Sequence, residues 1–438
     1  MNNVWVDLTD MLVWRGHYTG VQRVTYEYAI RYESAGAKFF AYDVIEERFF
    51  EISLRKVLSM HKNISGTHAK TKRSITLRRR IRKVIGRPYY QLDDASKALF
   101  QPYVYALNHT VRSTIHLAKS LQGKNKLEES ISEYASYPTA AFKRADTVIL
   151  LGAGWNEIKT LKSLSDLKAK NGFRISQHIN DMLPVYQPHL FSDELPRYFI
   201  PFAKLAVRVA DTITVISDAT KRDVEVFCKQ QGVQNSPKIA VIRLGDNPLN
   251  DNISKKPDAV VASEKYIFAL GTFEIRKNYQ ILYQAIKLAE LEQKELPKII
   301  IAGRSGWLTE DLRHVITRDP FVKDRIIWLN NVDDAELKWL FENCMFTVFP
   351  SLAEGWGLPI VESLSYGKMC LASGVSSMLE IGQGNVDYFL PYDARECMEK
   401  LMYYVTDGRY LDKNSKVKSD YKMYSWDASY ECFIATIK

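Results

Sequence analysis

Long apolar runs and paired cysteines are both missing from this sequence. No stretch of about 18 apolar residues occurs in the 438 residues, so no membrane-spanning helix is expected. The first residues lack a basic patch followed by an apolar segment, so a secretory signal is not expected either. The five cysteines are scattered and include no C-x-x-C pair, which argues against a disulfide framework or a zinc site. A reducing, cytoplasmic location is the simplest interpretation.

Acidic residues are missing from one long segment. Between Ile52 and Leu92 there are twelve Lys or Arg residues and no Asp or Glu. The formal net charge of the whole chain is +9, so this segment alone more than accounts for the excess. The rest of the protein is mildly acidic, which makes the segment a separate feature that needs its own explanation.

Short β-branched runs alternate with helical patterns along most of the chain. This alternation predicts an α/β fold with parallel sheets, and the length and 46% apolar content predict two domains. Strands are expected at Val4–Leu8, Lys38–Tyr42, Thr147–Leu151, Phe173–His178, Thr212–Ile216, Ile239–Ile242, Tyr266–Leu270, Lys298–Ala302, Ile326–Leu329, Phe346–Phe349 and Met369–Ala372. A polar, turn-rich stretch from Gly245 to Pro257 is the best candidate for a linker. Ligands are expected at the carboxyl ends of the strands.

The most informative motif runs from Glu354 to Glu362 and reads E-G-W-G-L-P-I-V-E. Gly355 and Gly357 allow a ligand to approach the main chain closely. Pro359 suits the first position of a helix predicted over Pro359–Tyr366, which places Glu362 in the first turn. The free N–H groups at this helix start favour an anion, while the carboxylates favour hydroxyls. A nucleoside diphosphate sugar combines both groups. The alternative is that the two acids merely stabilise the helix start.

Two cations occupy a turn in the second half of the chain. Arg276 and Lys277 follow the strand predicted at Tyr266–Leu270 and precede a helix. Cations at a helix N-terminus oppose the helix dipole, a misfit that a bound diphosphate would relieve. A solvated basic turn is the alternative.

The E-x7-E motif resembles the signature of the retaining glycosyltransferases of family 4, which adopt the GT-B fold of two Rossmann-like, doubly wound domains facing a central cleft. In that family the first Glu contacts hydroxyls of the donor sugar and the second contacts the nucleotide ribose, which implies these roles for Glu354 and Glu362. The loop between them implies a donor-binding set, namely Gly355, Trp356, Gly357 and Leu358. Arg276 and Lys277 resemble the family's basic diphosphate motif, although Thr272 stands where many relatives carry an Arg.

Three further loops resemble parts of the same family. The loop at Gly303-Arg304 lies near the nucleotide in relatives, and the loop containing Gly20 lies beside the diphosphate and acceptor. Asp181 matches an Asp that relatives place at the cleft, and it is the preferred candidate for an acceptor or sugar contact. For His178, a buried position in the core explains the sequence as well as a sugar contact does.

The resemblance implies a metal-independent hexosyltransferase without a cofactor. No Asp-x-Asp motif is present, the pattern with which the other large glycosyltransferase fold holds a divalent cation. The expected reaction transfers a hexose, with mannose from GDP-mannose as the leading donor, to a growing, lipid-linked bacterial surface polysaccharide such as an O-antigen. The expected domains are residues 1–245 for the acceptor, with a basic insertion at about 50–140, and 246–425 for the nucleotide sugar. Residues 426–438 are expected to form a helix that crosses back to the first domain.

The basic segment Lys70–Ile85 forms, if helical, an apolar stripe bordered by cations. Such a helix lies on an anionic membrane surface, which predicts a peripheral protein on the inner face of the cytoplasmic membrane. A solvated insertion is the plain alternative, and no nucleic-acid-binding motif is recognised.

Rival functions from the sequence are a transferase with another donor (rhamnose, glucose or N-acetylhexosamine), a GT-B nucleotide-sugar epimerase, and a non-catalytic binder of anionic membranes. The intact carboxylate pair Glu354 and Glu362 argues against the last of these.

Overall fold

A computed structural model of the chain describes residues 3–14, 20–65, 134, 136–246, 253–260 and 264–437. These residues form two compact units. The first comprises Met1–Met11, His17–Lys38 and Phe142–Lys438, and the second comprises Leu12–Gly16 and Phe39–Ala141. The predicted membrane segment Lys70–Ile85 and most of the Gly20 loop lie outside the described residues. Within the described part, no helix has both the length and the apolar character needed to cross a membrane.

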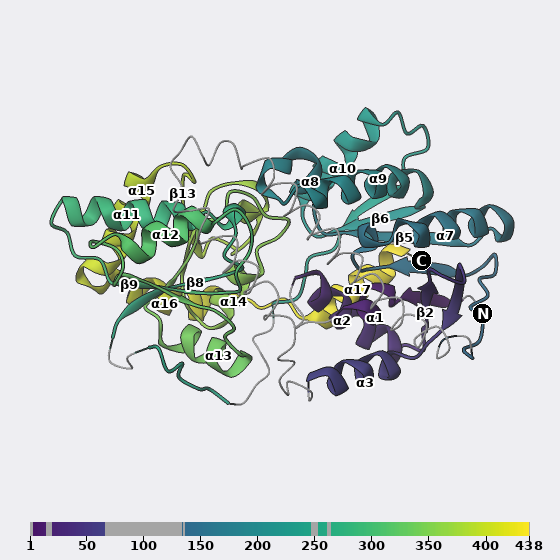
Figure 1. The fold of residues 1–438 in the computed structure, drawn as a ribbon, viewed down its shortest axis with the longest axis horizontal. Coiled ribbons are helices and arrows are strands. Elements are labelled where there is room, and N and C mark those ends of the chain that lie inside the picture. Colours follow the sequence, from purple (N-terminus) through teal and green to yellow (C-terminus); the bar gives the residue numbers. More distant parts are fainter. Residues whose placement is uncertain are drawn as a thin grey trace, which may run out of the picture. The chain divides into compact units, whose positions relative to one another are not determined.

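The first unit contains two parallel sheets (Figure 1), which confirms the expected pair of parallel-sheet α/β domains. Neighbouring strands of its first sheet follow the order β1, β4, β5, β6, β7. Their bounds are β1 (Val4–Asp7), β4 (Thr147–Leu150), β5 (Arg174–Ile179), β6 (Thr212–Val215) and β7 (Lys238–Val241). The accompanying helices are α1 (Thr9–Val13), α2 (Val21–Ser34), α7 (Ile158–Asn171), α8 (Leu183–Tyr186), α9 (Glu194–Val209) and α10 (Asp218–Gln230).

The second sheet has six strands in the order β10-β9-β8-β11-β12-β13. Their bounds are β8 (Tyr266–Leu270), β9 (Lys298–Ala302), β10 (Ile326–Leu329), β11 (Thr347–Phe349), β12 (Cys370–Ser373) and β13 (Val386–Phe389). Counted from β8, this is the common Rossmann order 3-2-1-4-5-6. All strands are parallel, but strands two and three are added on one side of the first strand and strands four to six on the other. The switch point therefore lies between β8 and β11, and a ligand is expected at their carboxyl ends.

Helices cover both faces of the second sheet. Figure 1 shows α11 (Tyr279–Leu291), α12 (Glu310–Arg318) and α15 (Ala394–Val405) on one face, with α13 (Asp334–Asn343), α14 (Leu358–Ser365) and α16 (Arg409–Asp420) on the other. Burial on both faces explains the near-continuous apolar run of β9, in which Ile299, Ile300 and Ile301 are at most 2% exposed. The sequence did not predict α1, α8 or α16.

The second unit contains an antiparallel strand pair, of which the sequence analysis predicted the first strand, at Lys38–Tyr42, and missed the second. Strand β2 (Lys38–Asp43) pairs with β3 (Arg48–Glu51), and α3 (Leu54–Ser65) follows. Strand β3 and helix α3 lie where the basic insertion was expected to begin, at about residue 50.

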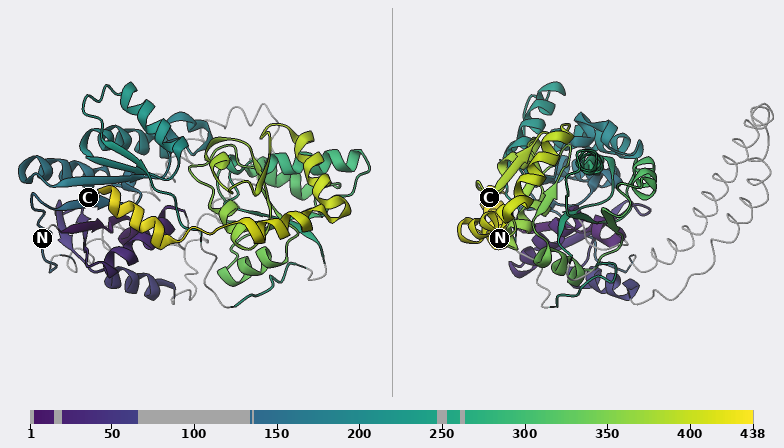
Figure 2. Two further views of the ribbon diagram at one scale, coloured as in Figure 1. Left: turned by 180° about the vertical axis from the view of Figure 1, so that it is seen from behind. Right: turned by 90° about the vertical axis from the view of Figure 1, so that its left-hand side faces the viewer.

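The last helix, α17 (Trp426–Ile437), lies along α2 (Figures 1 and 2). The hydroxyls of Tyr28 and Ser429 are 2.7 Å apart, and Phe433 contacts the rings of Tyr28 and His178. Nearby, Asp246 is 2% exposed and accepts a hydrogen bond of 2.5 Å from the amide of Tyr424. The start of the expected linker is therefore anchored by the chain that leads into α17.

Phe433→Ala is expected to lower the free energy of unfolding by about 3–5 kcal/mol, because Phe433 is fully buried between α17 and α2 and its removal leaves a cavity. Chemical denaturation measures the change. Glu431→Ala, an exposed substitution on the same helix, should stay within about 0.5 kcal/mol of the parent. Equal effects of the two substitutions would contradict the packing of α17 on α2.

Candidate active site

The turn after β8 carries the two expected cations and brings them close to the sheet. Gly271 directly follows β8, and the short 3-10 helix Ile275–Lys277 carries Arg276 and Lys277. Gly303, at the end of β9, has φ +158°, and a Cβ there would lie 1.9 Å from the carbonyl oxygen of Gly271. Glycine is thus required where these two strand ends meet.

The E-x7-E loop follows β11, on the other side of the switch point. Lys277 Nζ donates to Glu354 Oε1 at 2.6 Å, and Arg276 Nη1 lies 2.5 Å from Glu354 Oε2. The amide of Leu352 donates to the carbonyl of Arg276 at 2.8 Å, so the two loops are also joined through the backbone. The topology of the sheet therefore unites residues that are 77 positions apart in the sequence.

Two serines fix the backbone of the E-x7-E loop. The hydroxyls of Ser376 and Ser377 both donate to the carbonyl of Glu354 at 2.8 Å, and Ser377 also reaches the carbonyl of Trp356 at 2.8 Å. Sequence reasoning missed both serines because they lie in a 3-10 helix (Ser376–Glu380) beyond the next strand. They hold Glu354 in one position.

Burial and charge decide the protonation of this cluster. Burial alone would raise the pKa of Glu354, but Arg276 and Lys277 hold it at about 2. Burial lowers the pKa of Lys277, and the neighbouring Glu354 offsets part of that change. Burial also raises the pKa of Asp181, which Arg276 partly opposes. Glu354 is consequently a carboxylate at any physiological pH.

Helix α14 begins one residue earlier than predicted. Gly357, with φ +134°, is the N-cap, and Leu358 and Pro359 are the first two helical residues. Glu362 is therefore the fifth residue of α14, beyond the first turn, which corrects the prediction for its position. Its carboxylate is 6% exposed and forms an ion pair with Arg23 in the first turns of α2. Burial raises the pKa of Glu362, and Arg23 opposes the rise.

The other predicted residues take different places around this cluster. Asp181 follows β5 and accepts from the amide of Leu183 at 3.0 Å. A Cβ on Gly355 would lie 2.5 Å from the carbonyl of Asn180, so the E-x7-E loop closely approaches the Asp181 loop. Arg304 accepts through its carbonyl from the amide of Phe273 at 2.7 Å, and Gly20 precedes α2 with φ +49°.

Trp356 lies inside the loop and is 6% exposed. Its indole N–H is buried without a hydrogen-bond partner among the described atoms.

Two charged residues of this region were not identified from the sequence. Glu274 forms an ion pair with Arg276 at 2.7 Å, and Arg23 forms the pair with Glu362. The signal for Glu274 was its position two residues before the cationic pair in the same turn. The signal for Arg23 was its place in the first turn of the helix that follows Gly20.

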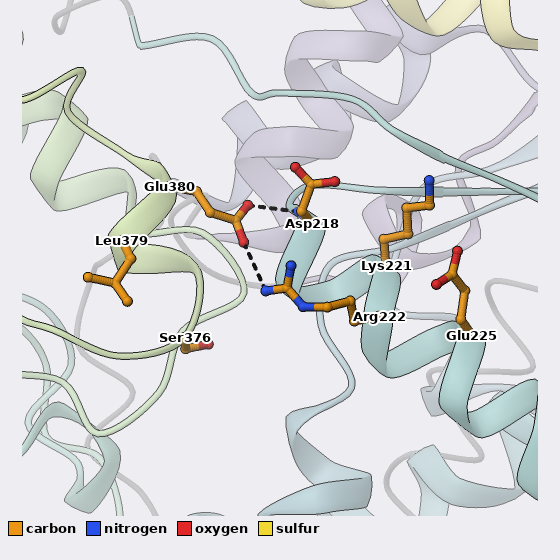
Figure 3. Close-up of a pocket in the computed structure, with 7 residues that line it drawn as sticks. All are labelled: Asp218, Lys221, Arg222, Glu225, Ser376, Leu379 and Glu380. Carbon is orange, nitrogen blue, oxygen red and sulfur yellow. Dashed lines mark hydrogen bonds and ion pairs between the residues drawn. The ribbon is translucent and has the colours of Figure 1, made fainter.

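A cavity of about 470 Å³ is lined by residues of α10 and of the 3-10 helix Ser376–Glu380 (Figure 3). Its lining includes Lys221 and Arg222 of α10 and Ser376, the serine that holds Glu354. Glu380 accepts hydrogen bonds of 2.7 Å from the amides of Asp218 and Ala219 at the start of α10. The walls are thus polar and carry both signs of charge.

His178 belongs to the core, which decides between the two interpretations of the sequence. It is 2% exposed, its Nδ1 is 3.0 Å from Thr214 Oγ1, and it packs against Tyr28 and Phe433. Burial lowers its pKa to about 4, so the folded protein holds it neutral.

His178 is expected to make stability depend on pH. Between about pH 6.5 and 4 the unfolded chain binds a proton that the folded chain does not, so stability falls with falling pH, by up to about 3 kcal/mol from this group. His178→Asn should remove this part of the dependence in urea denaturation at a series of pH values. The same loss of stability on acidification in both proteins would contradict the assignment.

Residues 251–418 match the family described as Glycosyl transferases group 1. The second sheet and its helices therefore form a group 1 glycosyltransferase domain. The whole fold is that of the GT-B glycosyltransferases. It is similar to the sucrose-phosphate synthase of Thermosynechococcus elongatus, with a TM-score of 0.57, 14% identity, and coverage of 99% of this chain and 98% of that one.

Anabaena HepE, solved in complex with UDP and glucose, has the same fold. It matches with a TM-score of 0.51 and 18% identity over 66% of this chain and 77% of that one. These structural likenesses concern the fold alone.

The sequence is similar to curated mannosyltransferases. It is 33% identical over 124 residues to O-antigen chain mannosyltransferase B of Escherichia coli, covering 28% of this chain and 32% of that protein. It is 27% identical over 217 residues to O-antigen chain mannosyltransferase RfbU of Salmonella typhimurium, covering 50% and 57%. The chain thus spans less than two thirds of the length of each.

Proposed function

We propose that the protein is a retaining glycosyltransferase that moves a hexose from a nucleoside diphosphate sugar to a hydroxyl of a growing, lipid-linked bacterial surface polysaccharide. The observation that supports it most directly is the pairing of Lys277 with Glu354 at the switch point of a group 1 glycosyltransferase domain. Mannose from GDP-mannose is the proposed donor, because the similar E. coli and Salmonella proteins are mannosyltransferases.

The proposed donor site exchanges one anion for another. In the structure Lys277 and Arg276 both form ion pairs with Glu354. An arriving diphosphate competes for Lys277, which releases Oε1 of Glu354 to accept hydrogen bonds from the sugar hydroxyls. Glu362 accepts from the ribose, and the backbone from Gly355 to Leu358 lines the sugar and phosphates. The N-terminus of α14 adds a favourable dipole for the anion.

The proposed chemistry needs no dedicated protein base. The acceptor hydroxyl approaches the anomeric carbon on the face of the departing diphosphate, and its oxygen forms the new bond as the old carbon–oxygen bond breaks. The acceptor proton passes to the departing phosphate oxygen. Lys277, with the positive charge of Arg276 beside it, stabilises the negative charge that develops there, the role a metal ion plays in other transferases. The reaction is accordingly proposed to be metal-independent and cofactor-free.

The two domains divide the substrates. We assign residues 1–245 to the acceptor and 246–425 to the nucleotide sugar, with 426–438 returning to the first domain. Asp181 is proposed to contact the acceptor or the sugar, because its loop closely approaches Gly355. Arg304 and Gly20 are proposed to border the nucleotide and the diphosphate.

The assignment predicts which variants lose donor turnover. Glu354→Gln and Lys277→Met should each lower kcat/KM by about 10²- to 10³-fold, because each removes a charge that acts on the sugar or the leaving group. The measurement is nucleoside diphosphate release from GDP-mannose with a lipid-linked mannoside acceptor, followed by NMR of the product anomer. UDP-glucose, UDP-N-acetylglucosamine and dTDP-rhamnose serve as competing donors.

Lys298→Met is the matched control, because Lys298 pairs with Glu264 at the opposite end of the sheet. It should turn over normally. Unchanged activity of both site variants would refute the site, and an inverted product would refute the retaining mechanism. Conversion of the donor without acceptor to an isomeric sugar nucleotide would instead indicate an epimerase.

On sequence grounds we also propose that Lys70–Ile85 binds an anionic membrane surface at the cytoplasmic side, where a lipid-linked acceptor is found. Arg78→Ala, Arg79→Ala and Arg80→Ala together should weaken co-sedimentation with phosphatidylglycerol vesicles by roughly 100-fold, since each cation contributes about 1 kcal/mol. Neutral phosphatidylcholine vesicles are the control. Equal binding of the parent to both kinds of vesicle would remove this proposal.

A further inference from the structure

Both terminal nitrogens of the Arg276 guanidinium contact protein groups. Nη1 lies 2.5 Å from Glu354 Oε2 and donates to the carbonyl of Ala353 at 3.1 Å. Nη2 donates to Glu274 Oε1 at 2.7 Å. The remaining Nε is buried without a hydrogen-bond partner among the described atoms. Arg276 thus joins the carboxylates of Glu274 and Glu354. Lys277 differs, because of these two carboxylates it contacts only that of Glu354.

Glu274 is buried and paired with Arg276. It is 2% exposed, and its carbonyl accepts from the amide of Lys277 at 3.1 Å. A Cβ on Gly306 would lie 2.8 Å from the Cβ of Glu274, so the glycine after β9 leaves the space that Glu274 occupies. A buried carboxylate is costly unless it is paired, and its pairing with Arg276 therefore fixes both side chains.

We propose that Glu274 is a positioning residue of the donor site. It fixes one edge of Arg276, so that the other edge holds Oε2 of Glu354 while Oε1 exchanges Lys277 for the sugar hydroxyls. This inference rests on the proposed function, because it assigns Glu354 to the donor sugar. Glu274 touches neither substrate and acts only through Arg276.

The arrangement explains why two carboxylates share one guanidinium. If Glu354 were the only anionic partner of Arg276, a donor that shifted the Glu354 carboxylate would also shift the guanidinium. A planar fork bound at both edges keeps its orientation, which a lysine ammonium does not provide. Orientation of Glu354 matters because small displacements of a substrate-positioning group cost large factors in rate.

The prediction separates sugar transfer from nucleotide binding. Glu274→Gln should lower kcat with GDP-mannose by about 10- to 100-fold, because Glu354 loses its fixed orientation. The affinity for GDP, measured by calorimetry, should change less than about threefold, because GDP lacks the hexose that Glu354 contacts. Glu274→Asp, which keeps the charge, should recover part of the rate. UDP replaces GDP as the probe if UDP-linked sugars prove to be the donors.

A double-mutant cycle provides the second readout. Arg276→Lys removes the fork, so Glu274→Gln in that background should cost little more than Arg276→Lys alone. Asp319→Asn is the control for loss of an ion pair, because Asp319 binds Lys287 at 2.8 Å and contacts none of the site residues. It should retain both rate and GDP affinity.

Each outcome decides a different claim. Parent-like turnover of Glu274→Gln, or additive effects in the cycle, would overturn the positioning role. Equal losses of GDP affinity and rate would also overturn it, since Glu274 would then serve the diphosphate or the fold. If Glu354→Gln turns over normally, the proposed function fails instead, whatever Glu274→Gln does.

Discussion

The ion pair between Lys277 and Glu354 is the contact on which the rest of the site depends. It exists because strands β8 and β11 are neighbours although β9 and β10 lie between them in sequence. The loops at these two carboxyl ends are in contact. Because both side chains are buried, the charge of each one affects the pKa of the other. Removing one partner of a buried pair typically costs about 3–5 kcal/mol, because the other charge is left without compensation. The site is therefore part of the fold's stability as well as its chemistry.

Mutual neutralisation also prepares the site for an exchange of partners. An unpaired Lys277 in this surrounding would lose its proton more readily, since burial already lowers its pKa. Glu354 keeps the ammonium charged and in place, and it is itself kept ionised, with a pKa of about 2. In the proposed function, a diphosphate that replaces Glu354 at Lys277 would meet a cation that is already oriented. Binding of the proposed donor would then require little reorganisation of the site.

Sequence patterns predicted the second sheet closely and the surroundings of the site less well. Strands β8, β9 and β10 have the predicted bounds, because apolar runs between Gly or Pro signals are local features. The E-x7-E motif and the cationic pair were likewise recognisable, from their residue types at helix starts and from the resemblance to glycosyltransferase family 4. Arg23 and the two serines were not, because their partners lie in other loops and only the tertiary fold identifies them. Glu274 was missed although its partner Arg276 lies two residues away in the same turn. The start of α14 was misplaced by one residue because Pro359 was assigned to the first helical position, which Leu358 occupies.

The same limitation explains why the sequence left His178 open between a core residue and a sugar contact, while it preferred Asp181 for the site. Both lie at the end of β5, in a stretch whose residues alternate between the two faces of the sheet. What distinguishes them is the neighbour each one meets: aromatic rings of α2 and α17 cover His178, whereas the motif loop approaches the loop of Asp181. Helix α17 is more than 240 residues away in sequence from both, so no local pattern carries this information. A residue's role at a strand end is thus decided by what the fold places over it.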